Sequence, residues 1–524
     1  MKTLVVLSGH IASGKTSLAL ALGKLGFNIV KTRDFLEGKT RAELQQSGEA
    51  FDRRDPEWLS NYVIGTMAVN DHVLVDAVRR QEQLDSFRRR LPGVRVFHIH
   101  MEASAEELTR RYRTRNEVTP FDRAISDVTE EQVDTLRATA DLVINTSRCD
   151  EQDALTRALA RLGLRRNNHA PLVDVLIGAQ YGSEGKGHIV SYIAPEYNVL
   201  IRTGGANAGH TVLVNGRPVI FKLLPSGTLH RKKGARVLLG PGMNIDVDVL
   251  LREIELAGLT QHDLMIDPQA WIVREDDKLN EQTAEAFVEK IGSTKQGVGE
   301  ATARRIRMRG SASKGQMAGD IHSLEPFLGA TLDILEDAYQ RGEKVLLEGT
   351  QGTGLSLFHG PYPFVTSRDT TAAGVMSEAG IPPKRINRVI MVTRTNPIRV
   401  ASPQGGSSGP MKRELSWEEV SARAKIPADV LREKERTSTT HRLRRIAEFD
   451  WSLLSRAASL NGPTDIALTF VDYIDHQNTE ARRFEQLTEE TRRFIEEIES
   501  VAGCPVSLIT TRFHERSIID RRSW

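Results

Sequence analysis

Short apolar runs alternate with longer stretches of helical spacing along most of the chain. In the first third, runs with the length and composition of buried strands lie at residues 3–7, 72–75, 94–100 and 140–144. Helical spacing is found between and after them, at residues 17–25, 104–115 and 150–162. Ser104, followed three residues later by Glu107, predicts a capping box at the start of the second of these helices. Strands that alternate with helices predict a parallel sheet covered by helices.

A polar stretch separates this block from a longer block of the same kind. Residues 165–171 lack periodicity and end in a proline, which indicates a linker. Beyond it, strands are predicted at residues 173–177, 199–202, 237–239, 344–347, 389–393 and 465–468. We therefore expect an α/β protein with two parallel-sheet domains, residues 1–164 and 172–524. The second is larger than the usual length of a single domain.

Composition excludes several classes of function. Among 524 residues, 71 Lys and Arg oppose 69 Asp and Glu, and a net charge of +2 argues against charge-driven binding of nucleic acid or an anionic membrane. No apolar run approaches the ~20 residues of a membrane span. The apolar start is interrupted at Gly9 and His10, too early for a signal peptide. Two cysteines, Cys149 and Cys504, form neither a disulfide framework nor a four-thiolate metal site. We expect a soluble cytoplasmic protein.

The first predicted strand is followed by a phosphate-binding loop. Residues 9–16 match the pattern G-x-x-x-x-G-K-[ST] completely, and they lie between a strand and a helix, as that loop requires. Gly9 and Gly14 let backbone N–H groups surround phosphate oxygens, Lys15 reaches the β- and γ-phosphates, and Thr16 ligates Mg²⁺. The first domain is therefore predicted to bind a nucleoside triphosphate.

Further segments of the first domain resemble kinases of the nucleoside-monophosphate and dephospho-CoA type. Asp34, after the second apolar run, and Asp76, at the end of a strand, resemble the acidic residues that those kinases place near the acceptor. Arg111 and Arg115 lie in an arginine-rich segment that resembles the kinase lid, and residues 140–145 (ADLVIN) resemble a late strand of the same family. The resemblance implies a kinase whose acceptor is unidentified. A domain that binds nucleotide without turnover is the alternative.

A second glycine-and-lysine loop opens the second domain, at residues 178–187. It is not a Walker A match, and alone it is a weak signal of phosphate binding. It is followed in order by GGANAGHT (204–211), LPSG (224–227), IGST (291–294), EGTQG (348–352), YPFVTS (362–367) and TTHRLRR (439–445). These ordered motifs, over roughly residues 172–516, resemble adenylosuccinate synthetase. That family uses GTP to join aspartate to C6 of a purine nucleoside monophosphate.

The resemblance implies a role for each matched residue. His210 matches the general acid, a role suited to imidazole near neutral pH, and Gln351 and Ser183 lie at catalytic positions. Nucleotide phosphates are expected at Gly182, Glu184, Gly185, Lys186 and Gly187. The monophosphate substrate is expected at Asn207, Thr294, Gln351 and Thr366. Mg²⁺ is expected at the Gly209 carbonyl and beside Ser183. The aspartate carboxylates are expected at Thr440, Arg442 and Arg444, because guanidinium groups suit paired carboxylates. The family also implies a homodimer.

One departure from the family bears on the substrate. Ser183 stands where the family places a catalytic aspartate that removes the purine N1 proton and ligates Mg²⁺. A serine hydroxyl is a poor base, so proton removal must rely on another group, a metal-bound water or the substrate's own acidity. Serine also removes a negative charge and leaves space beside N1 and C2 of the purine. This change resembles the phage 2-aminoadenylosuccinate synthetases, which act on dGMP, and it favours GMP or dGMP over IMP. An inactive paralogue is the alternative.

A second departure concerns the phosphoryl donor. Where the family has TKxD at the guanine base, this chain has Thr469-Phe470-Val471-Asp472. Asp472 is expected at guanine N1 and N2, but Phe470 replaces the lysine, so GTP, ATP and dATP all stay open as donors. The family also takes an arginine from its dimer partner. Here Arg304, Arg305, Arg307 and Arg309 surround that place, yet the best register puts Met308 there.

The leading hypothesis is a bifunctional nucleotide enzyme that uses L-aspartate, a purine (deoxy)nucleoside monophosphate and a nucleoside triphosphate. The synthetase half attaches aspartate to a purine that carries a 2-amino group, and the kinase half phosphorylates a nucleoside, a nucleotide or a small metabolite. Two rivals stay open: an ordinary adenylosuccinate synthetase that uses IMP and GTP, and a non-catalytic nucleotide sensor. A nucleic-acid-binding role is least favoured, because the chain lacks a basic domain with interleaved aromatic residues.

Overall fold

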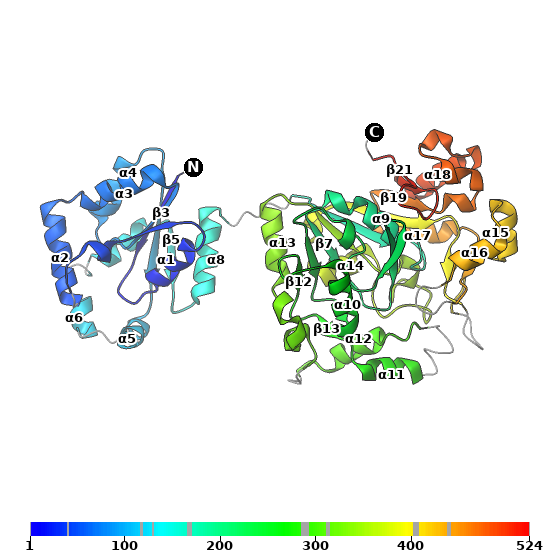
Figure 1. Cartoon of the computed structure of the whole chain (residues 1–524). Coiled ribbons are helices and arrows are strands. Elements are labelled where there is room, and N and C mark those ends of the chain that lie inside the picture. The colour runs from blue at the N-terminus through cyan, green and yellow to red at the C-terminus, as the bar shows by residue number, and fades with distance from the viewer. Residues whose placement is uncertain are drawn as a thin grey trace. The chain divides into compact units, whose positions relative to one another are not determined.

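The two series of apolar runs form two separate, mainly parallel sheets in the computed structural model (Figure 1). The structure describes residues 2–38, 41–115, 119–127, 130, 132–164, 170–283, 293–310, 315–401, 408–436 and 442–522. The chain divides into two units, Met1–Asn167 and Asn168–Trp524. Most of the linker predicted at 165–171 lies outside the described residues. In the described part of the chain, no helix is both long enough and apolar enough to cross a membrane.

The first unit is built around five parallel strands in the order β2-β3-β1-β4-β5. The strands are β1 (Thr3–Ser8), β2 (Asn28–Lys31), β3 (His72–Asp76), β4 (Arg95–Glu102) and β5 (Leu142–Asn145). The helices are α1 (Lys15–Gly23), η1 (Thr32–Phe35), α2 (Arg41–Arg54), α3 (Trp58–Val69), α4 (Gln81–Arg90), α5 (Ala105–Arg113), α6 (Phe121–Ile125), η2 (Val133–Thr139) and α8 (Glu151–Leu162).

Alternate residues of these strands build two cores, one on each face of the sheet. Val5 and Leu7 of β1 pack with α1 and α8, whereas Leu4 and Val6 pack with α3 and α4. The parallel α/β prediction is therefore confirmed. The capping box at Ser104 is half correct: its hydroxyl accepts from the Glu107 N–H at 3.3 Å. The Glu107 carboxylate instead pairs with arginines of its own helix.

The strands of the second unit are β6 (Val173–Gly178), β7 (Val199–Arg202), β8 (His210–Val214), β9 (Arg217–Phe221), β10 (Arg236–Leu239), β11 (Asn244–Ile245), β12 (Leu264–Ile266), β13 (Trp271–Ile272), β14 (Val345–Glu348), β15 (Ile386–Arg394), β16 (Ile398–Arg399), β17 (Glu414–Leu415), β18 (Arg445–Ala447), β19 (Asp465–Thr469), β20 (Val506–Thr510) and β21 (Ile518–Asp520).

Its helices are α9 (Lys186–Ile193), η3 (Ala194–Glu196), η4 (Thr228–His230), α10 (Val247–Ala257), α11 (Glu275–Thr283), α12 (Val298–Arg307), η6 (Ala318–Asp320), η7 (His322–Phe327), α13 (Thr331–Gln340), η8 (Thr353–Leu355), α14 (Ala372–Ala379), η9 (Pro383–Arg385), α15 (Trp417–Ala424), α16 (Ala428–Lys434), α17 (Trp451–Asn461), η10 (Val471–Tyr473), η11 (His476–Glu480), η12 (Phe484–Gln486) and α18 (Glu489–Ala502).

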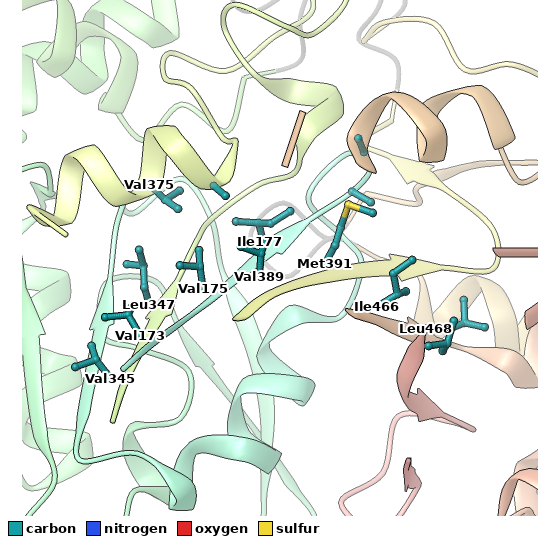
Figure 2. Close-up of a cluster of buried hydrophobic side chains, with 14 of the residues drawn as sticks. Val173, Val175, Ile177, Val345, Leu347, Val375, Val389, Met391, Ile466 and Leu468 are labelled. Carbon is teal, nitrogen blue, oxygen red and sulfur yellow. The ribbon is translucent and has the colours of Figure 1, made fainter. Parts of the chain in front are cut away.

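Nine strands form the main sheet of this unit, in the order β12-β10-β7-β14-β6-β15-β19-β20-β21. All pair in parallel except β21, which runs antiparallel to β20. Figure 2 shows one face of its centre, where Val175 of β6 and Leu347 of β14 lie near Val375 of α14, and Met391 of β15 lies farther along the same buried cluster. The opposite face packs on α9 through residues such as Leu176 and Ile390. All six predicted strands of this unit are present, with ends shifted by up to three residues.

The carboxyl ends of the five central strands bring the recognised motifs to one edge of the sheet. The loop after β6 is the glycine-and-lysine loop, the segment after β7 leads to His210, and β14 ends at Glu348. On the other side, β15 ends at Arg394 and β19 runs into the segment that contains Asp472. Ligand sites of parallel sheets lie at this edge, where strand order reverses direction. The fold therefore gathers residues that are far apart in sequence.

Candidate active site

A cavity of about 630 Å³ opens at this edge of the second unit. Its lining includes ten of the residues predicted from the motifs: Gly182, Ser183, Asn207, Gly209, His210, Thr294, Gln351, Thr366, Arg442 and Arg444. Thr440 was predicted for the same site and lies outside the described residues. The motifs that were separate in sequence thus share one cavity.

The glycine-and-lysine loop is shaped from within by Glu184. Its buried carboxylate accepts from the backbone N–H groups of Gln180 (2.9 Å) and Gly182 (2.8 Å). The Lys186 ammonium lies 2.7 Å from the same carboxylate and also donates to the Gly182 carbonyl. Because groups of the loop itself engage both oxygens of Glu184, this residue stabilises the shape of the loop. The phosphate contact predicted for Glu184 is a different role and stays a prediction.

Backbone conformation and close packing explain the glycines of this loop. Gly182 and Gly185 have φ of +94° and +82°, which favour glycine. Gly187 lies against His210: a Cβ there would come within 3.1 Å of the His210 Cβ. Gly187 therefore serves the close approach of α9 to β8, whereas Gly182 and Gly185 shape the backbone turn of the loop.

His210 is held by a buried carboxylate that the motif analysis left without a role. Its Nδ1 lies 2.5 Å from Oε1 of Glu348 and 3.1 Å from the Ser226 hydroxyl. Glu348 also accepts from the Ser226 backbone N–H at 2.7 Å and from its hydroxyl. In the described structure, His210 Nε2 is buried and has no hydrogen-bond partner. With Nδ1 committed to Glu348, Nε2 is the nitrogen available to a ligand.

The electrostatics around this pair favour a neutral imidazole. Burial and the nearby Arg202 guanidinium lower the pKa of His210 to about 4, against the opposing effect of Glu348. Burial raises the pKa of Glu348, but Arg202, His210 and Ser226 outweigh it and lower that pKa to about 2. Glu348 is therefore a carboxylate and Nδ1 carries the proton. A bound anion near Nε2 would favour the imidazolium.

Two further buried residues fix the loop that contains Ser226. Arg202, at the end of β7, donates to the carbonyls of Leu224 (3.0 Å) and Ala208 (2.7 Å). Glu253 of α10 accepts from the N–H groups of Lys222, Leu223 and Leu224. The sequence carries a signal for Arg202 and for Glu348, since each is the single charge that ends an apolar strand. Glu253 has no such signal.

Gln351 and Asn207 meet across the cavity floor. The Gln351 side-chain amide donates to Asn207 Oδ1 at 3.1 Å and its oxygen accepts from the Thr350 hydroxyl at 2.9 Å. Gln351 has φ of +58°, a left-handed conformation that is costly for a residue with a side chain. Its backbone lies against Gly182 of the glycine-and-lysine loop. The two motifs therefore fix each other's geometry.

Another buried glutamate positions the segment that contains Thr294. Glu281 of α11 accepts from the N–H groups of Gly297 (2.9 Å) and Gly299 (2.8 Å) and from the Ser293 hydroxyl (3.2 Å). Thr294 lines the cavity from this side. Thr366 lines it from the segment after η8, where its N–H donates to the Leu355 carbonyl at 2.8 Å.

The arginines predicted for the aspartate carboxylates differ in environment. Arg442 is exposed and lines the cavity. Arg444 is half-buried, and its Nη1 lies 3.4 Å from Oε2 of Glu435. Arg399, which the motifs did not indicate, also lines the cavity, with its guanidinium 4.4 Å from the centroid of the Tyr181 ring. The cavity therefore presents three guanidinium groups to an anionic ligand.

Asp472 lies just beyond the strand β19 and is 4% exposed. Its Oδ1 is buried and has no partner among the described residues. Burial raises its pKa to about 7, against the opposing charges of Lys434 and Arg394. The Phe470 ring would lie 3.2 Å from a Cβ placed on Gly185, and Arg394 stacks on that ring at 4.2 Å. A buried carboxyl oxygen without a partner among the described residues, in the segment that also carries the Phe470 ring beside the glycine-and-lysine loop, suits a nucleobase.

The phosphate-binding loop of the first unit has the expected local geometry. Gly9 has φ of +131°, and a Cβ there would come within 2.0 Å of the Met101 carbonyl, so only glycine fits. Gly14, with φ of +94°, precedes α1. The Lys15 ammonium donates to the carbonyls of Gly9 and His10 at 2.7 Å each. The Thr16 hydroxyl donates to Asp76 at 3.0 Å, which brings two predicted residues together.

The other predicted kinase residues are less closely gathered. Arg111 donates to the Thr146 hydroxyl at 2.9 Å, and that hydroxyl donates to the Ser13 carbonyl of the phosphate loop. Arg115 and Asp34 are exposed. Sequence analysis missed Glu130, a buried carboxylate that accepts from the Ile11 N–H at 3.2 Å and pairs with Arg79.

The donor atoms of both loops suit a hard cation. Among the described residues, no group of three or more His, Cys, Asp or Glu side chains could hold a metal ion. Near the second-unit loop, the Gly209 carbonyl and Ser183 hydroxyl are neutral oxygens, and the first unit offers Thr16 with Asp76. Oxygen ligands of this sparse kind fit Mg²⁺, which is usually completed by water and nucleotide phosphates.

Comparison with known protein families separates the two units. A model of the adenylosuccinate synthetase family matches residues 175–319 and 311–479. A model of an AAA domain matches residues 4–143. The adenylosuccinate synthetase of Methanocaldococcus jannaschii is 36% identical over 354 residues, which make up 67% of this chain and 96% of that protein. The Pyrococcus horikoshii enzyme is 38% identical over 353 residues, 66% of this chain and 98% of its own length.

Solved structures give the same fold for the second unit. A fully ligated adenylosuccinate synthetase from Plasmodium falciparum superposes with a TM-score of 0.58 at 23% identity, covering 67% of this chain and all of that one. The succinoaminodeoxyadenylate synthetase of cyanophage S-2L, solved with dGMP and with dATP as energy donor, gives a TM-score of 0.55 at 27% identity. It covers 67% of this chain and 96% of its own.

The contacts of Glu348 predict the tautomer of His210. In a Glu348→Gln variant, Ser226 still donates to the side-chain oxygen, so the new NH₂ group faces Nδ1 and forces the imidazole proton onto Nε2. We expect ¹⁵N-histidine spectra near pH 7.5 to show an Nδ1–H imidazole in the wild type and an Nε2–H imidazole in the variant. Ser226→Ala is the control and keeps the wild-type tautomer. An unchanged tautomer in Glu348→Gln would contradict this assignment.

Proposed function

Because the chain belongs to the adenylosuccinate synthetase family of ligases, we propose that its second unit attaches L-aspartate to C6 of a purine nucleoside monophosphate that carries a 2-amino group. GMP or dGMP is the acceptor, and the product is of the 2-aminoadenylosuccinate type. The first unit, which has a kinase-like P-loop domain, phosphorylates a separate small acceptor. One observation supports the synthetase assignment. The buried Nε2 of His210, which has no hydrogen-bond partner among the described residues, belongs to a cavity that Gly182 and Ser183 of the glycine-and-lysine loop and Arg442 and Arg444 also line.

The reaction proceeds in two steps. The purine loses its N1 proton and O6 attacks the γ-phosphorus of the triphosphate, so that the bond to the β-phosphate oxygen breaks and a diphosphate leaves. The aspartate amine then attacks C6, gives up a proton, and inorganic phosphate leaves with O6. His210 acts through Nε2: as negative charge builds on the phosphoryl oxygen, the imidazolium becomes favourable and donates a hydrogen bond to it. Glu348 holds the ring and stabilises its charge.

The family resemblance supports the following binding roles. Gly182, Gly185 and Lys186 receive the donor phosphates, with Glu184 holding the loop. Asn207, Gln351, Thr294 and Thr366 hold the monophosphate substrate. Arg442 and Arg444, together with Thr440, receive the aspartate carboxylates. When Mg²⁺ is bound beside Gly209 and Ser183, it neutralises phosphate charge. By family resemblance the active form is a homodimer, and the substrates suit the cytoplasm.

Ser183 supports the choice of a 2-amino purine. It lines the cavity without contributing a negative charge, whereas an aspartate there would occupy the space beside N1 and C2. The S-2L enzyme, with which this chain shares its fold, was solved with dGMP. A neutral hydroxyl cannot serve as the N1 base at neutral pH, so the proton leaves to water or to the bound phosphate.

Substrate competition tests this proposal. The full chain is incubated with L-aspartate, Mg²⁺ and a mixture of ATP and GTP, with IMP, GMP or dGMP supplied separately. We expect turnover of GMP or dGMP to exceed that of IMP. A Ser183→Asp variant should lose about tenfold in kcat/KM for the 2-amino acceptors, the scale of one misplaced group in a binding pocket, and should gain with IMP. Ser183→Ala is the matched control and keeps the 2-amino preference.

Exclusive turnover of IMP by the wild type would overturn the 2-amino assignment and leave an ordinary adenylosuccinate synthetase. No turnover with any acceptor, combined with retained nucleotide binding, would favour a sensor.

The protonation of Asp472 predicts how donor choice varies with pH. As a carboxylate it accepts from guanine N1–H and N2–H, and as a carboxylic acid it loses that ability but can donate to adenine N1. Its pKa is raised to about 7, so the carboxylate is lost as pH falls below that value. We expect the GTP-to-ATP ratio of kcat/KM to fall between pH 8 and pH 6. Asp472→Asn should flatten the ratio. A wild-type ratio that does not vary with pH would contradict this role.

The first unit is tested through its phosphate loop. With [γ-³²P]ATP and separate panels of nucleosides, nucleoside monophosphates and hydroxylated metabolites, Lys15→Ala should abolish transfer, because the lysine stabilises the transferred phosphoryl group. The same variant should retain aspartate ligation, and Lys186→Ala should show the reverse pattern. Transfer that persists in Lys15→Ala would contradict the assignment. Absence of transfer by the wild type to every acceptor would leave a nucleotide-binding role.

A further inference from the structure

A buried carboxylate lies between two arginines at the side of the cavity in the second unit. Glu435 follows α16 and is 3% exposed. Its Oε1 lies 2.8 Å from Nη2 of Arg394 and accepts from the Tyr473 hydroxyl at 2.7 Å. Its Oε2 faces Nη1 of Arg444 at 3.4 Å. Burial raises the pKa of Glu435, but the two guanidinium groups outweigh it, so Glu435 carries a negative charge.

Arg394 connects this carboxylate to the donor side of the site. It ends β15 and is 1% exposed. Its Nη1 donates to the Ser183 carbonyl of the glycine-and-lysine loop at 3.3 Å, and its backbone exchanges hydrogen bonds with the Gln180 side chain. Its guanidinium stacks on the Phe470 ring at 4.2 Å. One side chain therefore contacts both the phosphate loop and the segment that leads to Asp472.

Arg444 connects the same carboxylate to the cavity. It lines the cavity, and its backbone N–H donates to the Glu435 carbonyl at 3.0 Å. An isolated bridge between Arg436 and Leu443 lies beside that bond. Glu435 thus holds Arg444 through main chain and side chain together. The side-chain contact at 3.4 Å is longer than the 2.8 Å contact to Arg394, which makes it the weaker of the two.

The charges of this group do not cancel. Two guanidinium groups share one carboxylate, and Arg444 is the member that reaches the cavity. A carboxylate ligand that enters the cavity can bind the Arg444 guanidinium group, because Glu435 binds that group only weakly. The more firmly Glu435 is engaged by Arg394, the more completely Arg444 is available to that ligand.

We infer that Glu435 is a positioning residue that couples the donor nucleotide to the aspartate substrate, through Arg394 on one side and Arg444 on the other. This inference rests on the proposed function for the identity of the two ligands. A nucleotide that orders Phe470 and the loop at Ser183 fixes Arg394, and Arg394 then holds Glu435 away from Arg444. The donor therefore tightens binding of aspartate, and by linkage aspartate tightens binding of the donor to the same extent.

Calorimetry measures this coupling without requiring turnover. L-aspartate is titrated into the full chain with dGMP and Mg²⁺ present, with and without a saturating non-hydrolysable analogue of GTP or ATP. We expect the analogue to lower the aspartate Kd of the wild type by about fivefold or more, the usual lower end of coupling between sites. In Glu435→Gln the two aspartate Kd values should become nearly equal, because a neutral amide oxygen attracts either guanidinium group much less than a carboxylate does.

The chain offers a matched control for the loss of a buried carboxylate. Asp465, 3% exposed at the start of β19, pairs with Arg388 at the opposite end of the sheet from the cavity. Asp465→Asn removes a buried carboxylate partner of an arginine without touching the site, and it should keep the wild-type ratio of Kd values. Should Glu435→Gln fail to fold, Glu435→Asp retains the charge but withdraws it by one methylene, and it should reduce the ratio.

The outcomes separate this inference from the proposed function. A wild type with a Kd ratio near one, or a folded Glu435→Gln or Glu435→Asp variant with the wild-type ratio, overturns the coupling role. Equal loss of the ratio in Asp465→Asn overturns it too, because the effect would then be general. Turnover in the substrate competition decides the proposed function independently.

Discussion

A carboxylate that leaves water must find donors for both of its oxygens, and this requirement shapes the site of the second unit. Five buried glutamates, Glu184, Glu253, Glu281, Glu348 and Glu435, each accept from backbone N–H groups or from cationic and hydroxyl side chains. Glu184, Glu281 and Glu435 each hold a segment that lines the cavity. Glu348 holds His210, and Glu253 holds the loop that leads to Ser226. Removing such a carboxylate leaves buried donors unpaired at about 1–3 kcal/mol per group, so these loops are held firmly.

This arrangement separates positioning from chemistry. The oxygens of these glutamates accept hydrogen bonds from donors of the protein itself, while the groups that face the cavity can still bind ligands. His210 shows the division most clearly: Glu348 and Ser226 engage Nδ1, and Nε2 stays unpartnered within the described structure. Preorganised groups of this kind need little rearrangement when charge develops on a substrate. The neutral Ser183 adds no charge to the cavity lining, and the proposed preference for a 2-amino purine rests on this.

Among the described residues, the phosphate-binding loop of the first unit is held by fewer buried charges than the loops of the second unit. Its loop is closed by the Lys15 ammonium on main-chain carbonyls and by the contact between Thr16 and Asp76. Glu130 resembles the glutamates of the second unit, because it accepts from the loop's Ile11 N–H. In both units a glycine with positive φ precedes the helix that follows the loop, Gly14 before α1 and Gly185 before α9. The same local backbone geometry therefore follows a strand in two different sheets.

The sequence by itself determined the features that depend on short spacing. Apolar runs predicted the strands, and the ordered motifs predicted ten residues of one cavity, because each motif folds locally around its glycines. Tertiary structure alone decided which distant residues meet. Glu348 lies 138 positions from His210, and Arg394 lies 211 from Ser183. Those pairings depend on the order β7-β14-β6-β15 within the sheet, and local periodicity carries no information on which strands become neighbours.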